Sequence, residues 1–220
     1  MTARMTAGMP VAPSIHGLGR KGGGRIGLLG GSFNPAHEGH LHISREALRR
    51  LRLDAVWWLV SPQNPLKSTD GMAPLTVRMA SAAAVARHPR IHPTAIESSL
   101  GTRYTADTLA ALKAHFPGTH FVWLMGADNL IQLPRWARWR EIAEMVPIAV
   151  FGRPAYSLRA MQGKVAQRYA RQRVDAADAG RLAGLAPPAW AFFPIKLHTA
   201  SSTALRAAGQ AAADFGGSKQ

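Results

Sequence analysis

Two histidines three residues apart, His37 and His40, follow a pair of glycines at the end of a short apolar segment. Gly30 and Gly31 come where the strand predicted over residues 25–29 ends, so another backbone or a ligand can approach them closely. A helix beginning near His37 would direct unpaired N–H groups and the positive end of its dipole into the same space. Both histidines would lie on one face of that helix and could donate to phosphate oxygens. The pattern predicts a phosphate-binding site.

Two other interpretations of the histidine pair remain open. A zinc site would need a third ligand at a suitable spacing, and His-Glu-Gly-His departs from the H-E-x-x-H pattern. A pair of surface histidines without function is the second alternative. We expect no metal ligands among the side chains of the protein itself.

Apolar segments alternate with amphipathic ones along the chain, and the two kinds predict different elements. The predicted strands cover residues 25–29, 55–60, 91–96, 120–126, 148–152 and 192–198. The predicted helices cover residues 38–51, 76–87, 105–115, 135–145, 157–170 and 201–212. Repeated alternation of strand and helix is typical of an α/β fold with a doubly wound parallel sheet, in which ligands bind beyond the carboxyl ends of the strands.

The composition bounds the class of protein. At 220 residues and 47% hydrophobic content, the chain can form one core, so we expect a single domain over residues 25–220 after a disordered tail over residues 1–24. Two matches to G-x-G-x-x-G in residues 17–27 precede the first strand and are discounted as a dinucleotide fingerprint. Without a membrane span or a secretory signal, the expected compartment is the cytoplasm. Cysteine is absent, and the net charge of +15 favours an anionic partner.

Six segments, in chain order, resemble the motifs of one known family. GGSFNPAHEGH, residues 30–40, is similar to the G-G-[ST]-F-[DN]-P-x-H-x-G-H signature of bacterial nicotinate mononucleotide adenylyltransferases, which belong to the HxGH nucleotidyltransferase superfamily. In two of the segments, Arg103 replaces a serine and Ala200 an isoleucine of the family pattern. The other five segments are SPQNPLKS (61–68), RYTADTL (103–109), LMGADNLIQLPRWARWREI (124–142), VFGRP (150–154) and ASSTALR (200–206).

The resemblance implies a Rossmann-like nucleotidyltransferase fold and an adenylyl transfer. The phosphate of nicotinate mononucleotide would attack the α-phosphorus of ATP, with Mg²⁺ bound to ATP, and give nicotinate adenine dinucleotide and pyrophosphate in NAD biosynthesis. The attacking phosphate is already an anion, so the site must supply in-line placement and positive charge rather than a base.

The resemblance also implies roles for individual residues. His37, His40 and Arg206 would be catalytic, the histidines as donors to the ATP phosphates and the arginine on the leaving pyrophosphate. The other ATP-binding residues would be Gly30, Gly31, Ser32, Phe33, Gly126, Asp128, Arg153, Ser201, Ser202 and Thr203. Those for nicotinate mononucleotide would be Lys67, Tyr104, Thr105 and Trp136, with Trp139 as the alternative aromatic residue.

Other functions remain open at this point. A related enzyme of the superfamily could use nicotinamide mononucleotide, either alone or with dual specificity, or phosphopantetheine. A basic nucleic-acid-binding protein would use the excess of arginine and lysine, but no zinc-finger or RNP motif supports it. We therefore expect ATP and nicotinate mononucleotide as partners, no membrane and no nucleic acid, and leave a homo-oligomer open.

Overall fold

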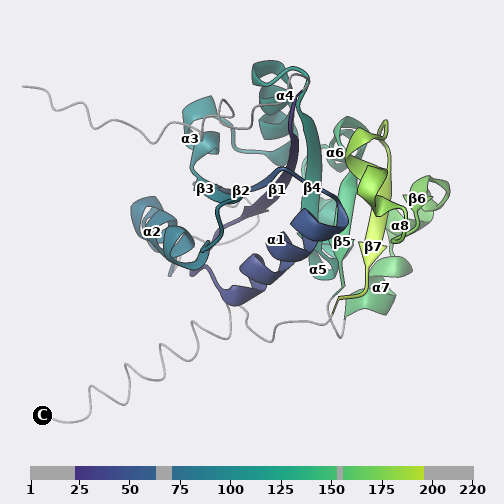
Figure 1. Ribbon diagram of the computed structural model, residues 1–220, viewed down its shortest axis with the longest axis horizontal. Helices are drawn as coiled ribbons and strands as arrows, with labels where there is room; N and C mark the ends of the chain where they lie inside the picture. The colour runs from purple at the N-terminus through teal and green to yellow at the C-terminus, as the bar shows by residue number, and fades with distance from the viewer. Residues whose placement is uncertain (1–22, 63–70, 153–155, 196–220) are drawn as a thin grey trace, which may run out of the picture.

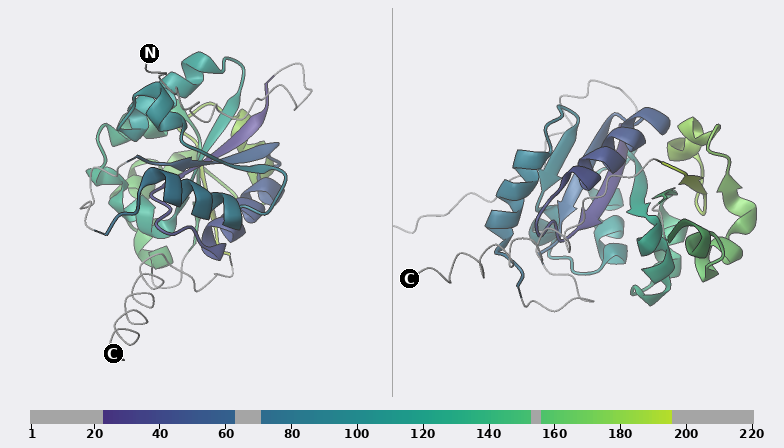
Figure 2. Two further views of the ribbon diagram at one scale, coloured as in Figure 1. Left: turned by 90° about the vertical axis from the view of Figure 1, so that its left-hand side faces the viewer. Right: turned by 90° about the horizontal axis from the view of Figure 1, so that it is seen from below.

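A single parallel sheet organises the molecule. The computed structural model describes residues 23–62, 71–152 and 156–195. Within these residues the sheet has seven strands in the order β3-β2-β1-β4-β5-β7-β6, and every neighbouring pair is parallel. Helices cover both of its faces (Figures 1 and 2). This is the α/β, doubly wound, Rossmann-like fold that the sequence predicts.

The elements follow each other along the chain as strand and helix in alternation. The strands are β1 (Arg25–Gly31), β2 (Ala55–Val60), β3 (Ile91–Thr94), β4 (His120–Gly126), β5 (Ile148–Phe151), β6 (Arg173–Val174) and β7 (Trp190–Phe193). The α-helices are α1 (Glu38–Arg50), α2 (Leu75–Val85), α3 (Ile96–Leu100), α4 (Thr105–His115), α5 (Ala127–Gln132), α6 (Trp139–Met145), α7 (Ser157–Met161) and α8 (Lys164–Arg168). Short 3-10 helices are η2 (Leu133–Arg135), η4 (Ala170–Gln172) and η5 (Ala179–Gly184).

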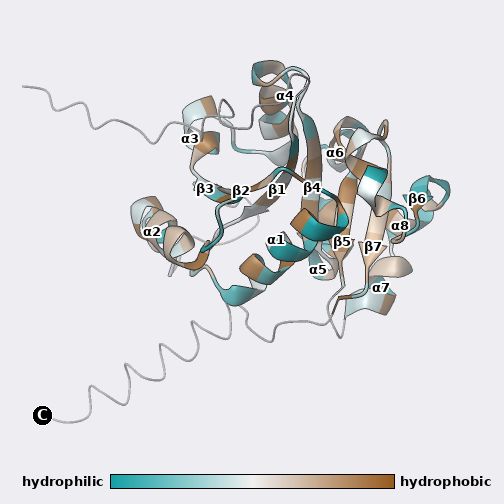
Figure 3. Ribbon diagram, viewed as in Figure 1, coloured by the Kyte–Doolittle hydropathy of each residue, from teal (hydrophilic) through white to brown (hydrophobic). Residues whose placement is uncertain are grey.

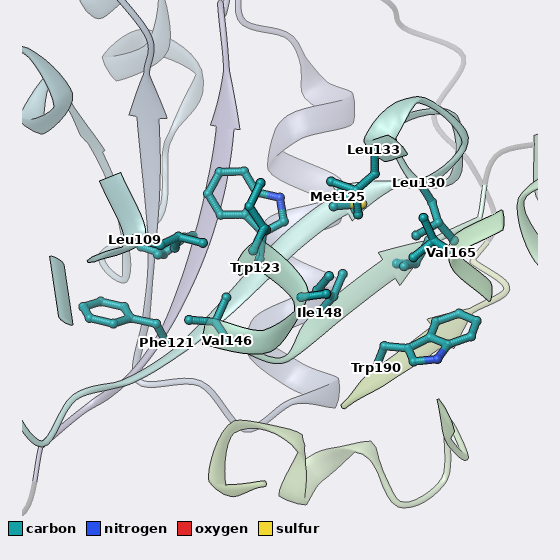
Figure 4. Close-up of a cluster of buried hydrophobic side chains, with 14 of the residues drawn as sticks. Leu109, Phe121, Trp123, Met125, Leu130, Leu133, Val146, Ile148, Val165 and Trp190 are labelled. Carbon is teal, nitrogen blue, oxygen red and sulfur yellow. The ribbon is translucent and has the colours of Figure 1, made fainter. Parts of the chain in front are cut away.

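Alternate residues of the strands enter two separate cores, one on each face of the sheet. In β2, Trp57 belongs to the core that also contains residues of α3 to α8, whereas its neighbour Trp58 belongs to the core that contains residues of α1, α2 and η5. Figure 4 shows part of the first core, in which Leu109, Trp123 and Trp190 come from α4, β4 and β7. Because both faces are covered, the central strands are mostly hydrophobic, and Figure 3 shows this as brown on β4 and β5.

Several predicted boundaries are wrong. The strand predicted over 91–96 ends at Thr94 because α3 begins at Ile96. The last strand starts at Trp190, and Pro194, which has no N–H to donate, follows its end at Phe193. The helix predicted over 157–170 is divided in two at Gly163, which is the N-cap of α8. The helix predicted over 135–145 begins only at Trp139.

Some predictions fall largely outside the described residues. The proposed tail lies there except for Gly23 and Gly24, and the carbonyl of Gly24 accepts a hydrogen bond from the His120 N–H at 2.9 Å. The predicted helix over 201–212 lies there entirely. Within the described residues, no helix is long and apolar enough to cross a membrane.

Candidate active site

His37 and His40 form the N-terminal cap of α1. His37 is the N-cap, and its Nδ1 accepts a hydrogen bond from the Gly39 N–H at 3.1 Å. In return, the Nδ1 of His40 accepts one from the His37 N–H at 3.2 Å. The two imidazoles thereby satisfy N–H groups that a helix start leaves without an intrahelical partner. The helix begins next to His37, as the sequence predicts.

The capping arrangement fixes what each imidazole can do for a ligand. A ring nitrogen that accepts a hydrogen bond carries no proton, so on both neutral rings the proton is on Nε2, and Nε2 is the donor. The two rings lie together, with centroids 3.8 Å apart. This geometry suits two donors to an anion and does not suit two bases.

A hydrophobic and hydrogen-bonded support holds the His40 ring. The ring lies 4.6 Å from that of Phe33, which stacks on Trp58 at 5.1 Å. Trp58 donates from Nε1 to the Ser44 hydroxyl at 2.7 Å, and Ser44 donates to the His40 carbonyl at 2.8 Å. Phe33 is only 1% exposed although its φ of 48° lies in the left-handed region. Its buried side chain therefore supports the histidines, and only its backbone is available to a ligand.

The need for glycine at position 30 has a different cause from the one expected. A Cβ there would lie 2.6 Å from the Trp123 ring, so the indole of Trp123 occupies the space that a side chain would need. At Gly31 the nearest atom to a Cβ would be in the Phe33 ring at 3.4 Å, an ordinary contact. The close approach is thus made by an aromatic side chain of the neighbouring strand.

Arg78 on α2 is a buried positioning residue that the sequence did not reveal. It is 2% exposed, and its guanidinium donates to the carbonyls of Ser32 at 2.8 Å and Ser61 at 2.7 Å. It also donates to the carbonyls of Pro62 at 3.0 Å and Ala73 at 2.9 Å. Burial lowers the pKa of this guanidinium. One side chain therefore joins the loop after β1 to the residues that flank the segment containing Lys67.

The side chain of Asn34 reinforces this connection. Its Nδ2 donates to the Gly71 carbonyl at 2.9 Å, and its Oδ1 accepts from the Ala73 N–H at 3.2 Å. The Ala36 N–H donates to the Ser81 hydroxyl at 3.2 Å. The side chains of Asn34, Arg78 and Ser81 therefore hold residues 32–36 against residues 71–81.

We expect replacement of Arg78 by lysine to lower the free energy of unfolding by about 2 kcal/mol. Lysine keeps the charge but has no planar fork, so some of the four buried carbonyls lose their donor, and each such loss costs about 1–3 kcal/mol less any relaxation. Urea unfolding monitored by circular dichroism measures the change. Arg87→Lys, whose side chain is 73% exposed, is the matched control. Equal stability of both variants would contradict this role.

The end of β4 lies beside the end of β1, because the two strands are neighbours in the sheet. Gly126 is the N-cap of α5, and Asp128 lies in the first turn of this helix. Asp128 is therefore not the N-cap of this helix. Both residues lie at the carboxyl edge of the sheet, where ligands of this fold bind.

A cavity of about 140 Å³ opens between these strand ends. It brings together Tyr104, Thr105 and Trp136, the three described residues expected to contact the pyridine ring. Trp139 does not line it and instead packs edge-on against Tyr169. The remaining lining residues are Gly30, Gly31, Ser61, Glu97, Arg103, Trp123, Asn129 and Ala137.

Thr105 and Trp136 differ in the backbone N–H donors that they can offer to a ligand in the cavity. Thr105 starts α4, whose N-terminus has no side-chain cap. The Trp136 N–H, in contrast, already donates to the Leu133 carbonyl at 2.9 Å as part of the η2 turn. The first turn of α4 is therefore the better source of N–H donors.

Glu97, on α3, is the buried carboxyl group of this cavity, and sequence reasoning missed it. It is 8% exposed, and its Oε1 accepts from the Thr108 hydroxyl at 3.1 Å. Burial raises the pKa of Glu97 to about 7, although the Thr108 and Ser61 hydroxyls favour the ionised form. A single glutamate in the sequence IESSL carries no spacing signal that would distinguish it from a surface residue.

The raised pKa of Glu97 predicts a dependence of stability on pH. The folded state holds the proton more tightly than the unfolded state, so the stabilisation is complete below pH 4.5 and is lost as pH rises to about 7. The loss would be on the order of 3 kcal/mol. Unfolding free energies of the wild type and Glu97→Gln should therefore diverge between pH 5 and pH 8. Parallel curves would contradict a raised pKa.

Six of the expected site residues lie outside the described residues. They are Lys67, Arg153, Ser201, Ser202, Thr203 and Arg206. For these residues the roles implied by the sequence stay predictions. Within the described residues, no group of three or more His, Cys, Asp or Glu side chains could hold a metal ion.

Comparison with known proteins agrees with the geometry. The model of the cytidylyltransferase-like family matches residues 28–208. A protein of Parvibaculum lavamentivorans named "Probable nicotinate-nucleotide adenylyltransferase" is 58% identical over 185 residues, which are 84% of this chain and 92% of that protein. The chain belongs to the nicotinate-nucleotide adenylyltransferases. Another member of this adenylyltransferase family, from Cereibacter sphaeroides, is 57% identical over 84% of this chain and 98% of its own. The family expected from the six motifs is confirmed.

A solved structure supports the fold of this adenylyltransferase. Nicotinic acid mononucleotide adenylyltransferase of Plasmodium falciparum, complexed with NaAD, has a TM-score of 0.64. The match covers 84% of this chain and 83% of that chain, at 16% identity. At this identity the likeness concerns the fold alone.

Proposed function

We infer that the protein transfers the adenylyl group of ATP to nicotinate mononucleotide, giving nicotinate adenine dinucleotide and pyrophosphate in NAD biosynthesis. The observation that carries this function is the 58% identity to a nicotinate-nucleotide adenylyltransferase over 92% of its length. Paired histidine donors at the start of α1 and an aromatic cavity beside them are consistent with it. We propose that the reaction takes place in the cytoplasm, where ATP is available.

In this mechanism the protein positions two anions and stabilises charge. The Nε2–H groups of His37 and His40 would donate to the ATP phosphates as charge develops at the α-phosphorus. Ser201, Ser202, Thr203 and Arg206 would bind the leaving pyrophosphate. The adenosine would lie near Gly126, Asp128 and Arg153, and the backbone of residues 30–33 would pass along the phosphates. No residue needs to remove a proton from the attacking phosphate.

Nucleotidyltransferases of this family use a divalent metal ion with ATP, and we propose Mg²⁺ for this protein. The described residues offer no acidic cluster that would hold the ion alone, and an ion carried by ATP phosphates requires none. When bound, it would neutralise phosphate charge. The protein's own part is to hold the phosphates in line with the attacking mononucleotide.

For the second substrate, we propose that Lys67 binds the phosphate of nicotinate mononucleotide and that the cavity binds its ring. Tyr104 and Trp136 would contact the flat faces of the pyridine, and Thr105 would bring the N-terminus of α4 to its carboxylate. Release of pyrophosphate from ATP, Mg²⁺ and nicotinate mononucleotide tests the function directly. Tight binding of DNA at physiological salt without pyrophosphate release would instead favour a nucleic-acid-binding protein.

A further inference from the structure

Two residues that line the cavity proposed for the pyridine ring each carry a buried polar atom without a hydrogen-bond partner among the described residues. These atoms are Oε2 of Glu97 and the indole Nε1 of Trp123. Both residues line the cavity, and they are 8% and 3% exposed. A buried polar atom that lacks a partner costs about 1–3 kcal/mol, so a ligand that supplies the missing hydrogen bonds gains from them.

The walls around these atoms are aromatic and nearly perpendicular. The Trp123 and Trp136 rings have centroids 6.2 Å apart and an interplanar angle of 89°. Trp123 stands on β4, as Figure 4 shows, and also fills the space above Gly30. An aromatic ring held in this space would bring its polar substituent within the same small cavity as the Glu97 carboxyl group.

We propose that Glu97 is a specificity-determining residue of the mononucleotide pocket: as the neutral acid it donates a hydrogen bond to the carboxylate of nicotinate mononucleotide, and as the carboxylate it accepts one from the carboxamide of nicotinamide mononucleotide. This inference rests on the proposed function. The pocket would then contain two kinds of group for the ring substituent. The N–H groups of α4 only donate hydrogen bonds, whereas Glu97 donates when it is neutral and accepts when it is ionised.

The surroundings of Glu97 keep a substantial fraction of its carboxyl group neutral near pH 7. Burial is the main cause of its raised pKa of about 7, and the two hydroxyls that oppose it, Thr108 and Ser61, carry no charge. The Thr108 hydroxyl also contacts the Thr102 hydroxyl at 2.9 Å and the Tyr104 carbonyl at 3.3 Å, so Glu97 shares it with two other partners. An ionised Glu97 would face the substrate carboxylate at short range in a poorly hydrated site, which is unfavourable.

Few other ionisable groups face this position. β2 packs against α3 and carries none, and α3 carries no other. Tyr104, the N-cap of α4, lines the cavity, whereas Asp107 on α4 is 42% exposed and pairs with Arg138. Arg103 lines the cavity from the preceding loop. Among the described residues, Glu97 is thus the carboxyl group placed to respond to pH within this cavity.

The test is the ratio of kcat/KM for nicotinate mononucleotide to that for nicotinamide mononucleotide, measured from pH 6 to pH 8.5. Titration of the substrate phosphate, of ATP and of the histidines affects both substrates alike and cancels in the ratio. In the wild type we expect the ratio to fall by about tenfold or more as Glu97 ionises, because each pH unit above the pKa lowers the neutral fraction tenfold.

Glu97→Gln separates this role from a structural one. The glutamine amide keeps a donor but cannot titrate, so its ratio should stay constant across the same pH range. Glu141→Gln, at a carboxylate that is 55% exposed on α6, is the matched control and should keep the wild-type curve. Calorimetric titrations at pH 8 in two buffers should also show more protons taken up with nicotinate mononucleotide than with its amide, a difference that Glu97→Gln loses.

The outcomes are distinguishable. Turnover of nicotinate mononucleotide with a ratio that is the same at pH 6 and pH 8.5 would overturn the inference and leave the proposed function intact. An equal fall of the ratio in wild type and Glu97→Gln would assign the pH dependence to another group and also overturn it. Absence of pyrophosphate release with either mononucleotide at every pH would contradict the proposed function itself.

Discussion

Replacement of His40 by alanine is expected to lower kcat on the order of 100-fold or more while changing the affinity for ATP only a few-fold. A donor to charge that develops during the reaction acts mainly in the transition state, and removal of a comparable donor in other enzymes has an effect of this size. Steady-state kinetics give kcat, and calorimetry of ATP binding gives the affinity. Turnover within a few-fold of wild type would remove His40 from the mechanism.

The double role of His40 calls for variants that separate the cap from the donor. Asparagine can place an acceptor near the position of Nδ1, so His40→Asn would keep the cap on the His37 N–H and lose the donor. Glutamine can place its amide near Nε2, so His40→Gln would keep a donor and lose the cap. We expect glutamine to recover more of the turnover than asparagine. His42→Ala, a change at a half-buried histidine of the same helix, is the control.

A preference of at least ~100-fold for nicotinate mononucleotide over nicotinamide mononucleotide is the second large effect expected, expressed as a ratio of kcat/KM at pH 7. N–H donors in the first turn of α4 can satisfy both oxygens of a carboxylate. A carboxamide instead places its NH₂ group against one of these N–H groups. Both are donors, so neither of the two buried groups has a hydrogen-bond acceptor. Mismatches of this kind discriminate strongly between substrates of equal shape.

Salt distinguishes this short-range pairing from the general attraction of a cationic protein. With a net charge of +15, the protein favours the more negative substrate at long range, but this contribution is screened as salt increases. We therefore expect most of the preference to persist at high salt. Similar kcat/KM values for the two substrates would instead indicate a mononucleotide adenylyltransferase of dual specificity.

Strand–helix alternation predicted the fold and the location of the histidines, because both depend on local periodicity and on the residues at helix starts. β2 and β4 have the predicted bounds, and His37 is the N-cap of α1. The boundaries that failed depend on contacts made far along the chain or on single residues such as Gly163.

The chemistry of the pocket was less predictable for physical reasons. Trp136 was expected from its motif. Its N–H, however, donates to the Leu133 carbonyl within a 3-10 turn that contains Pro134, and the motif does not reveal this hydrogen bond. The burial of Glu97 and Arg78 depends on how separate elements close over them, and their neighbours in sequence contain no information about it. Periodicity places an element on the sheet; it does not reveal which single polar group becomes enclosed.

The contact between Gly30 and Trp123 limits how the pocket could be redesigned for synthetic pyridine analogues. The Trp123 indole forms one wall of the pocket and lies against Gly30, where an added methyl group would be 2.6 Å from the indole ring. The two positions must therefore change in a set order: a smaller residue at 123 comes first, and only then does position 30 tolerate a side chain. A library that randomises position 30 alone should return glycine, whereas one that varies both positions should yield enlarged pockets.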